Sequence, residues 1–119
     1  MINLPPNASF FLAQHPINMG ISFDGLLGLV RDSLHADPFS PTFFLFLNRR
    51  RDRIKIFYWD DDGFAIWYKR LEEGTYRLPF LIPAEDGNVH LTRAQLAMLL
   101  EGLDFTKAER RKRFSKKSA

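Results

Sequence analysis

Short apolar runs separated by turn residues predict several strands in this 119-residue chain. Runs of about 4–8 apolar or alternating residues bounded by Gly, Pro, Asn or Asp are typical of strands. Five segments have this character, the last of them weakly: residues 8–13, 43–47, 53–59, 64–69 and 75–78. Pro79 and Pro83 then bracket a segment that we expect to be irregular.

The segment 53–59 alternates between its two faces, as a half-buried strand does. One face carries Ile54, Ile56 and Tyr58, and the other carries Arg53, Lys55, Phe57 and Trp59. Three aspartates and Gly63 follow, and we expect a tight turn in which the glycine supplies a positive φ. Residues 53–69 are therefore predicted to form a β-hairpin.

Two segments have helical periodicity instead. Ser22 can cap a helix that begins at Phe23 and ends before Asp37-Pro38, because the residue before proline avoids the helical region. Thr92 and Gln95 have the spacing of a capping box, and leucines follow at helical intervals. Together these elements predict an α+β fold, an antiparallel β-meander of three to five strands with two helices packed on one face. We expect a single domain over residues 1–106 and a basic, flexible tail over residues 107–119.

The charge is distributed unevenly. Residues 107–119 hold seven basic side chains and one acidic side chain, whereas the rest of the chain holds ten basic and thirteen acidic ones. The net charge of +3 therefore comes from the tail, and within the body the residues 49–55 form a local island of positive charge. Separate basic patches favour a polyanionic partner.

The basic island precedes an aromatic run, and this combination admits two interpretations. Arginines can contact phosphates, and Trp59, on the same strand face as Arg53 and Lys55, can stack on an unpaired base. The same residues also suit an ordinary amphipathic hairpin in which charges protect a sheet edge and most rings are buried in the core.

Several classes of function lack support in the sequence. There is no cysteine, which excludes disulfides and thiolate chemistry and fits a cytoplasmic protein. No apolar run reaches the roughly 20 residues of a membrane span. The three histidines are scattered, no phosphate-binding glycine motif is present, and the consecutive aspartates at 60–62 would point in different directions in a turn. We therefore expect no enzymatic activity, no metal, no cofactor and no small-molecule substrate.

The chain resembles a known family over residues 1 to about 105. The family is that of TnpB, the small accessory protein encoded by the second open reading frame of IS66-type bacterial insertion sequences. The matching segments are Phe23-Asp24-Gly25-Leu26, Asp37-Pro38-Phe39-Ser40, Arg49-Arg50-Arg51-Asp52-Arg53-Ile54-Lys55-Ile56, Tyr58-Trp59-Asp60-Asp61-Asp62-Gly63-Phe64, Trp67-Tyr68-Lys69-Arg70-Leu71-Glu72 and residues 91–102 (LTRAQLAMLLEG).

The resemblance implies a non-catalytic role in DNA transposition beside a separate, larger transposase. DNA and that transposase are then the expected partners, with DNA contacts at element ends. A rival hypothesis is a protein-interaction adaptor that docks on the transposase or a host factor through rings around Trp59 and Trp67 and never touches DNA. The residues expected at a nucleic-acid interface are Arg49, Arg50, Arg51, Arg53, Lys55, Trp59, Lys69, Arg70, Arg110, Arg111, Lys112 and Arg113.

The sequence departs from the family pattern at two positions. Relatives usually carry Arg-Lys-Gly where this chain has Gly20-Ile21-Ser22, and often carry glycine where this chain has Asp61. The first difference shifts any DNA contact toward residues 49–55 and the tail. The second makes the hairpin turn more acidic.

Overall fold

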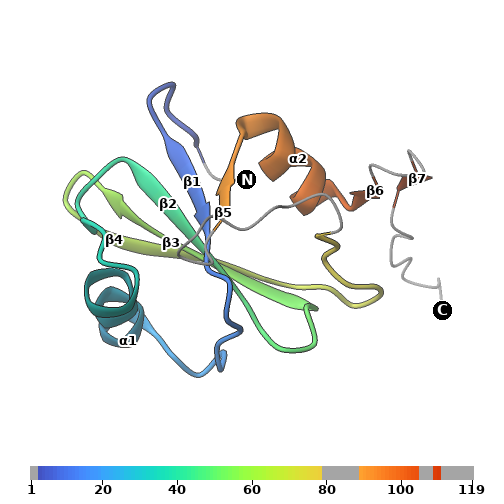
Figure 1. Ribbon diagram of the computed structural model, residues 1–119, viewed down its shortest axis with the longest axis horizontal. Helices are drawn as coiled ribbons and strands as arrows, with labels where there is room; N and C mark the ends of the chain where they lie inside the picture. The colour runs from blue at the N-terminus through green and yellow to red at the C-terminus, as the bar shows by residue number, and fades with distance from the viewer. Residues whose placement is uncertain (1–2, 79–88, 105–108, 111–119) are drawn as a thin grey trace, which may run out of the picture.

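The strand β2 (Thr42–Leu47) lies at the centre of a five-stranded sheet because both of its faces are apolar. The computed structural model describes residues 3–78, 89–104 and 109–110. Its sheet has the strand order β4-β3-β2-β1-β5, and the class is α+β, as the sequence predicts (Figure 1). The other strands are β1 (Ser9–Leu12), β3 (Arg53–Asp60), β4 (Gly63–Arg70) and β5 (Val89–Leu91).

Four of the five predicted strands are present within a residue or two of their expected bounds. Residues 75–78 form no strand, and the fifth strand is β5, which sequence reasoning missed because it is only three residues long. A second, two-stranded sheet pairs β6 (Leu103–Asp104) with β7 (Glu109–Arg110). The irregular segment expected between Pro79 and Pro83 lies outside the described residues.

The meander is only partly correct. Strands β2, β3 and β4 follow one another as antiparallel neighbours, but β1 pairs with β2 in parallel. A parallel pair needs a crossover of about a dozen residues or more, usually with a helix. The segment between β1 and β2 meets this need, since it contains α1 (Phe23–Gly28) and its continuation η1 (Leu29–Ser33).

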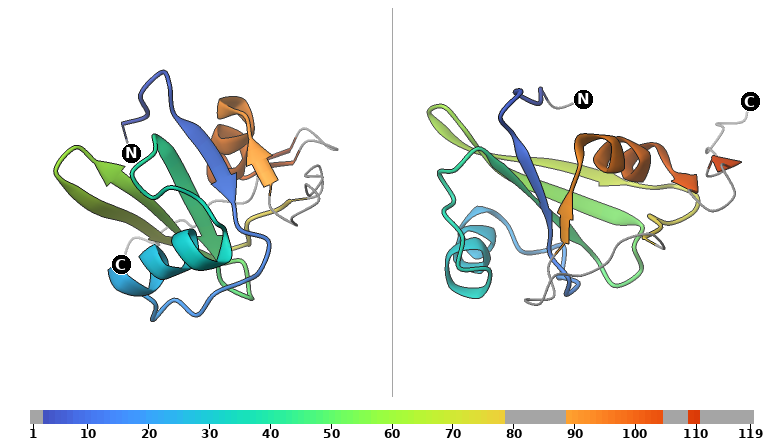
Figure 2. Two further views of the ribbon diagram at one scale, coloured as in Figure 1. Left: turned by 60° about the vertical axis from the view of Figure 1, so that its left-hand side comes forward. Right: turned by 45° about the horizontal axis from the view of Figure 1, so that its top comes forward.

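The two helices cover opposite faces of the sheet, not one face as predicted (Figure 2). Leu26 and Val30 of the first helix pack in one buried cluster with the phenylalanines at 11, 44, 46 and 57. The helix α2 (Arg93–Glu101) packs through its leucines in a second cluster with Phe10, Leu45 and Ile56. Side chains alternate along β2, so its apolar run from Phe43 to Leu47 requires cover on both sides.

The helix ends agree in part with the prediction. Helix α2 has the complete capping box, with the Thr92 side chain accepting from the Gln95 amide and the Gln95 side chain accepting from the Thr92 amide. Helix α1 begins at Phe23 as expected, but Ser22 makes no side-chain capping bond. From Leu29 to Ser33 the helix continues as a π-helix. It ends at Ser33, before Asp37-Pro38 as predicted. Among the described residues no helix is long and apolar enough to span a membrane.

In the turn between β3 and β4 the residue with a positive φ is an aspartate and not the predicted glycine. Asp61 has a φ of 52°, whereas Gly63 is the first residue of β4 and is not in the left-handed region. Aspartate tolerates that region better than most side chains, and glycine tolerates it best. An aspartate at position 61 is therefore compatible with this turn.

A double-mutant cycle tests whether the two helices pack on separate faces. Val30→Ala and Leu99→Ala each remove buried methyl groups, and we expect free energies of unfolding lowered by about 2 and about 3 kcal/mol. Because the two side chains lie in different clusters, the double variant should lose the sum within about 0.5 kcal/mol in urea titrations. A coupling energy well above that value would contradict the arrangement.

Candidate nucleic-acid interface

The turn between β2 and β3 is held in one shape by the side chain of Asn48. Its Oδ1 accepts hydrogen bonds from the backbone amides of Asp52 (3.1 Å) and Arg53 (3.0 Å). Its Nδ2 donates to the Asp52 carboxylate at 2.6 Å. An asparagine that closes its own turn in this way replaces backbone hydrogen bonds that a regular hairpin would supply. The arginines at 49, 50 and 51 are therefore carried on a fixed turn.

Neighbouring backbone reinforces that turn. The amide of Arg51 donates to the carbonyl of Asn48, and the carbonyls of Arg51 and Asp52 accept from the amides of Tyr76 and Leu71, both at 2.7 Å. Arg51 has a φ of 58°, a left-handed value that directs the chain back toward β3. The turn is thus tied both to itself and to the segment that follows β4.

The side chains of Arg49, Arg50 and Arg51 are exposed, as the sequence predicts. Across residues 3–78, 89–104 and 109–110, none of the three forms an ion pair within 4 Å. Exposed guanidinium groups without an internal carboxylate partner remain available to a phosphate, which they match with a planar fork of donors.

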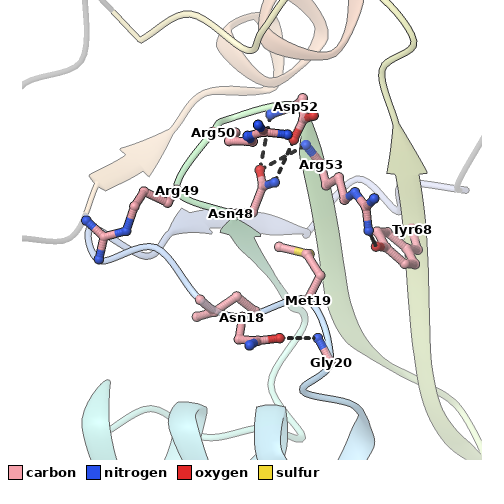
Figure 3. Close-up of a pocket in the computed structure, with 10 residues that line it drawn as sticks. Asn18, Met19, Gly20, Asn48, Arg49, Arg50, Asp52, Arg53 and Tyr68 are labelled. Atoms are coloured by element: carbon pink, nitrogen blue, oxygen red, sulfur yellow. Dashed lines mark hydrogen bonds between the residues drawn. The ribbon is translucent and has the colours of Figure 1, made fainter.

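A pocket of about 540 Å³ opens beside this turn, on the face of the sheet that α1 covers. One wall is the segment that leaves β1, and the other is the β2–β3 turn with the start of β3 (Figure 3). We call it the arginine pocket, and its lining residues are Ile17, Asn18, Met19, Gly20, Asn48, Arg49, Arg50, Asp52, Arg53 and Tyr68. Gly20, the first residue of the departure from the family pattern, is part of the lining.

Arg53 and Tyr68 form the β-sheet side of the pocket. The Arg53 Nη1 donates to the Tyr68 hydroxyl at 3.2 Å, so the guanidinium and the ring are held together (Figure 3). Tyr68 is 46% exposed although it lies on a strand, because β4 is the edge of the sheet. The pocket therefore combines cations with an accessible aromatic ring.

The prediction that Lys55 is part of the exposed nucleic-acid interface is wrong, because this lysine is buried. Its side chain is 6% exposed, and its Nζ donates to the carbonyls of Met19 (2.8 Å) and Ile21 (2.7 Å). The same Nζ lies 4.9 Å from the centre of the Tyr68 ring. Because its donors are committed to backbone oxygens, Lys55 holds the pocket wall in place and is not positioned to contact a phosphate.

Lys69 and Arg70, at the end of β4, differ in their surroundings. Lys69 is exposed and pairs with Ile54 across the ladder, so it lies on the α2 face, away from the arginine pocket. Arg70 pairs with Arg53 on the α1 face, but both its Nε and its Nη2 bond Glu72 at 2.8 Å. The carboxylate of Glu72 offsets part of the positive charge of Arg70.

Trp59 is separated from the arginines by the length of the hairpin. It lies six residues beyond Arg53 on β3, roughly 20 Å along the strand. There it packs against Phe39 and Phe64, with ring centres 5.0 Å away in each case, beside the acidic turn. Trp59 and Arg53 share a strand face, as predicted, but they do not share a site.

The neighbouring Tyr58 lies on the opposite face, stacked on Phe43 with ring centres 4.5 Å apart. Burial raises the pKa of its hydroxyl, and the nearby carboxylate of Asp60 raises it further. Tyr58 is therefore a partly buried ring packed against the core, and its surroundings favour the neutral hydroxyl.

The predicted tail contacts fall largely outside the described residues. Arg110 belongs to β7, of which only the backbone is described, and Arg111, Lys112 and Arg113 lie beyond it. Within the part of the chain that the structure describes, no three His, Asp or Glu side chains gather closely enough to hold a metal ion.

Sequence reasoning missed two residues that shape the site. The first is Asn48, which is absent from the predicted interface although an asparagine four residues before an aspartate can close such a turn. Tyr68 is absent from the interface residues that the sequence predicts, among which Trp59 is the stacking ring. The signal for Tyr68 was the ladder register of the hairpin, which places it opposite Lys55 at the basic end.

Comparison with known proteins identifies the family. The sequence model of the IS66 Orf2 like protein family matches residues 8–110. The chain belongs to this family. The Orf2-like proteins are accessory proteins of IS66-type insertion sequences, and their role is in transposition.

Two relatives come from Sinorhizobium fredii (strain NBRC 101917 / NGR234). The protein described as uncharacterized protein y4jC is 32% identical over 111 residues, which cover 93% of this chain and 92% of the relative. Uncharacterized protein y4hO is 29% identical over 99 residues, covering 83% and 84%. No solved structure matches this Orf2-like chain significantly.

Replacing the buried ammonium tests the structural role of Lys55. In Lys55→Met the carbonyls of Met19 and Ile21 lose their donor, and we expect the free energy of unfolding to fall by about 2 kcal/mol. The matched control Lys69→Met removes an exposed lysine from the adjacent strand and should change it by less than about 0.5 kcal/mol. Equal losses in a denaturant titration would contradict this role.

Proposed function

We propose that this Orf2-like protein binds DNA through the exposed arginines of the β2–β3 turn and thereby assists the transposase at the ends of its element. The observation that carries the proposal is the set of exposed guanidinium groups, Arg49, Arg50 and Arg51, on a turn fixed by Asn48. Such groups neutralise phosphates without first breaking internal ion pairs. Because the family has a role in transposition, DNA is the polyanion that we propose as the partner.

The charge along the hairpin supports an oriented contact. At one end of the hairpin, where β3 begins and β4 ends, Arg53 and Lys69 lie next to the β2–β3 turn with its arginines. The other end carries three aspartates at positions 60–62. A phosphate backbone is attracted to the first end and repelled by the second. This polarity would place the acidic turn away from DNA.

The tail adds to the same proposal. Residues 107–119 carry six more positive than negative charges, and the strand β7 places Arg110 beside Leu103 at the exit of α2. A basic extension of this kind would neutralise roughly three to five further phosphates. It would increase affinity without reading sequence.

A second candidate is docking on the transposase or on a host factor, and the acidic end of the hairpin favours it. Phe39 is 60% exposed, and its ring lies 5.0 Å from Trp59 and 5.4 Å from Phe64. Exposed rings beside charged residues are frequent interface anchors. Trp67, the other ring of the adaptor hypothesis, is partly buried against the α2-side core and contributes less. Because the two ends of the hairpin are separate, both activities can reside in one molecule.

The DNA contact is tested by salt dependence. The variant Arg49/Arg50→Ala leaves Arg51 in place, since alanine is unfavourable at a φ of 58°. We expect weaker binding to a labelled duplex at low salt, and a plot of log affinity against log salt that is shallower by about 1.8 for two lost phosphate contacts. The measurement is fluorescence anisotropy at several salt concentrations.

A single substitution provides the matched control for this experiment. Arg31→Ala removes an exposed arginine from η1, where it lies 4.0 Å from Asp32, and should leave the slope unchanged. Arg50→Ala alone should reduce the slope by about 0.9. Identical slopes for Arg31→Ala and Arg50→Ala would mean that the turn does not contact DNA.

Truncation tests the tail. A chain ending at Arg110 loses five positive charges, and we expect its salt slope to fall by about 4.5 if each of the five contacts a phosphate. Thermal unfolding should be unaffected within about 1 °C, because the described core lies entirely before residue 103. An unchanged slope would assign the tail to solubility.

A further inference from the structure

The geometry points to an unpaired nucleotide as the ligand of the arginine pocket, with its base stacked on Tyr68 and its phosphate held by the pocket arginines. This inference rests on the proposed DNA binding and specifies which form of DNA the site prefers. It would distinguish a strand with exposed bases, as at an opened or cleaved element end, from an intact duplex.

The first argument is the chemistry of the lining. Arg49, Arg50 and Arg53 provide cationic donors, whereas the sole carboxylate, that of Asp52, already accepts from Asn48. The wall opposite the turn consists of residues 17–20. Ile17 and Met19 supply apolar side chains, the Asn18 Oδ1 already accepts from the Gly20 amide, and the Met19 carbonyl already accepts from Lys55. A pocket with surplus donors, two apolar side chains and an aromatic ring suits a ligand that is anionic at one end and aromatic at the other.

The second argument is the state of Tyr68. Its hydroxyl is fixed by Arg53, its ring is approached by the buried Nζ of Lys55, and 46% of its surface is still exposed. A ring held at two points and left open loses little freedom when a base stacks on it. Two other large apolar side chains of the described residues are comparably exposed, Phe23 and Phe39, and neither lines the pocket.

The third argument concerns size and shape. A volume of about 540 Å³ lies within the range of about 300–1,000 Å³ that small-molecule pockets span. Figure 3 shows Arg49 and Tyr68 at opposite ends of the lining, with Arg53 and Met19 between them. One nucleotide could therefore place its phosphate near an arginine and its base on the ring of Tyr68. In a duplex the faces of the bases are covered by their neighbours, and a ring can stack only on a base that has left the stack.

The test compares two DNA probes that differ only in a single-stranded end. One is a blunt duplex, and the other is the same duplex with a short thymine overhang containing a fluorescent adenine analogue. For the full-length protein we expect binding of the overhang probe to be about 5- to 150-fold tighter, the range expected from stacking of one base. The fluorescence of the analogue should be quenched on binding.

Three variants separate stacking from charge. Tyr68→Ala should abolish the preference for the overhang and the quenching, while binding to the blunt duplex keeps its salt slope. Tyr68→Phe retains the ring and should keep most of the preference. Phe23→Ala removes a ring of similar exposure (48%) from α1 and should behave as the wild type. Because Tyr68 is at the surface of an edge strand, its replacement is compatible with folding.

The outcomes are distinct. Equal affinity of the wild type for the two probes, with a steep salt slope for both, would overturn this inference and leave the proposed DNA binding intact. Failure to bind either probe at low salt would overturn both. If free thymidine monophosphate bound as tightly as the overhang, the pocket would be a site for a soluble nucleotide and the inference would again fail.

Discussion

The burial of β2 on both faces is the constraint on which the rest of this structure depends. Five consecutive apolar residues, Phe43 to Leu47, point alternately to the two sides of the sheet, and each side must be covered. The first helix therefore packs on one side and α2 on the other. A helix between β1 and β2 also allows these strands to pair in parallel, which an antiparallel meander would not.

This arrangement brings the chain after β1 to the basic end of the hairpin. The amides of Ala13 and Ile17 donate to the carbonyls of Leu45 and Leu47, so the segment continues alongside β2 before it turns toward α1. At that turn the carbonyls of Met19 and Ile21 meet the ammonium of Lys55. The arginine pocket is thus formed by two segments about thirty residues apart in sequence, joined by one buried cation.

The cations of residues 49–55 consequently divide into three kinds. Lys55 is enclosed and satisfies backbone oxygens, Arg53 is tied to Tyr68, and the three arginines of the turn are exposed on a frame built by Asn48. Residues that look alike in the sequence therefore differ in the structure: some cations hold the fold together, and others are exposed and available to a ligand. The hairpin also separates this basic end from the acidic, aromatic end near Phe39 and Trp59, so the protein has two surfaces of different chemical character.

The sequence by itself determined the elements that depend on local chemistry. The alternation of residues 53–59, the capping box at Thr92 and the start of the first helix at Phe23 are properties of neighbouring residues, and the family resemblance rests on the same segments. Tertiary structure alone decided the face that each helix covers, the parallel pairing of β1, the burial of Lys55 and the approach of Tyr68 to Arg53. These features depend on contacts between residues that are distant in the sequence. Lys55 follows Arg53 by two positions, and this spacing is the same whether the lysine ammonium lies in solvent or donates to a buried backbone carbonyl.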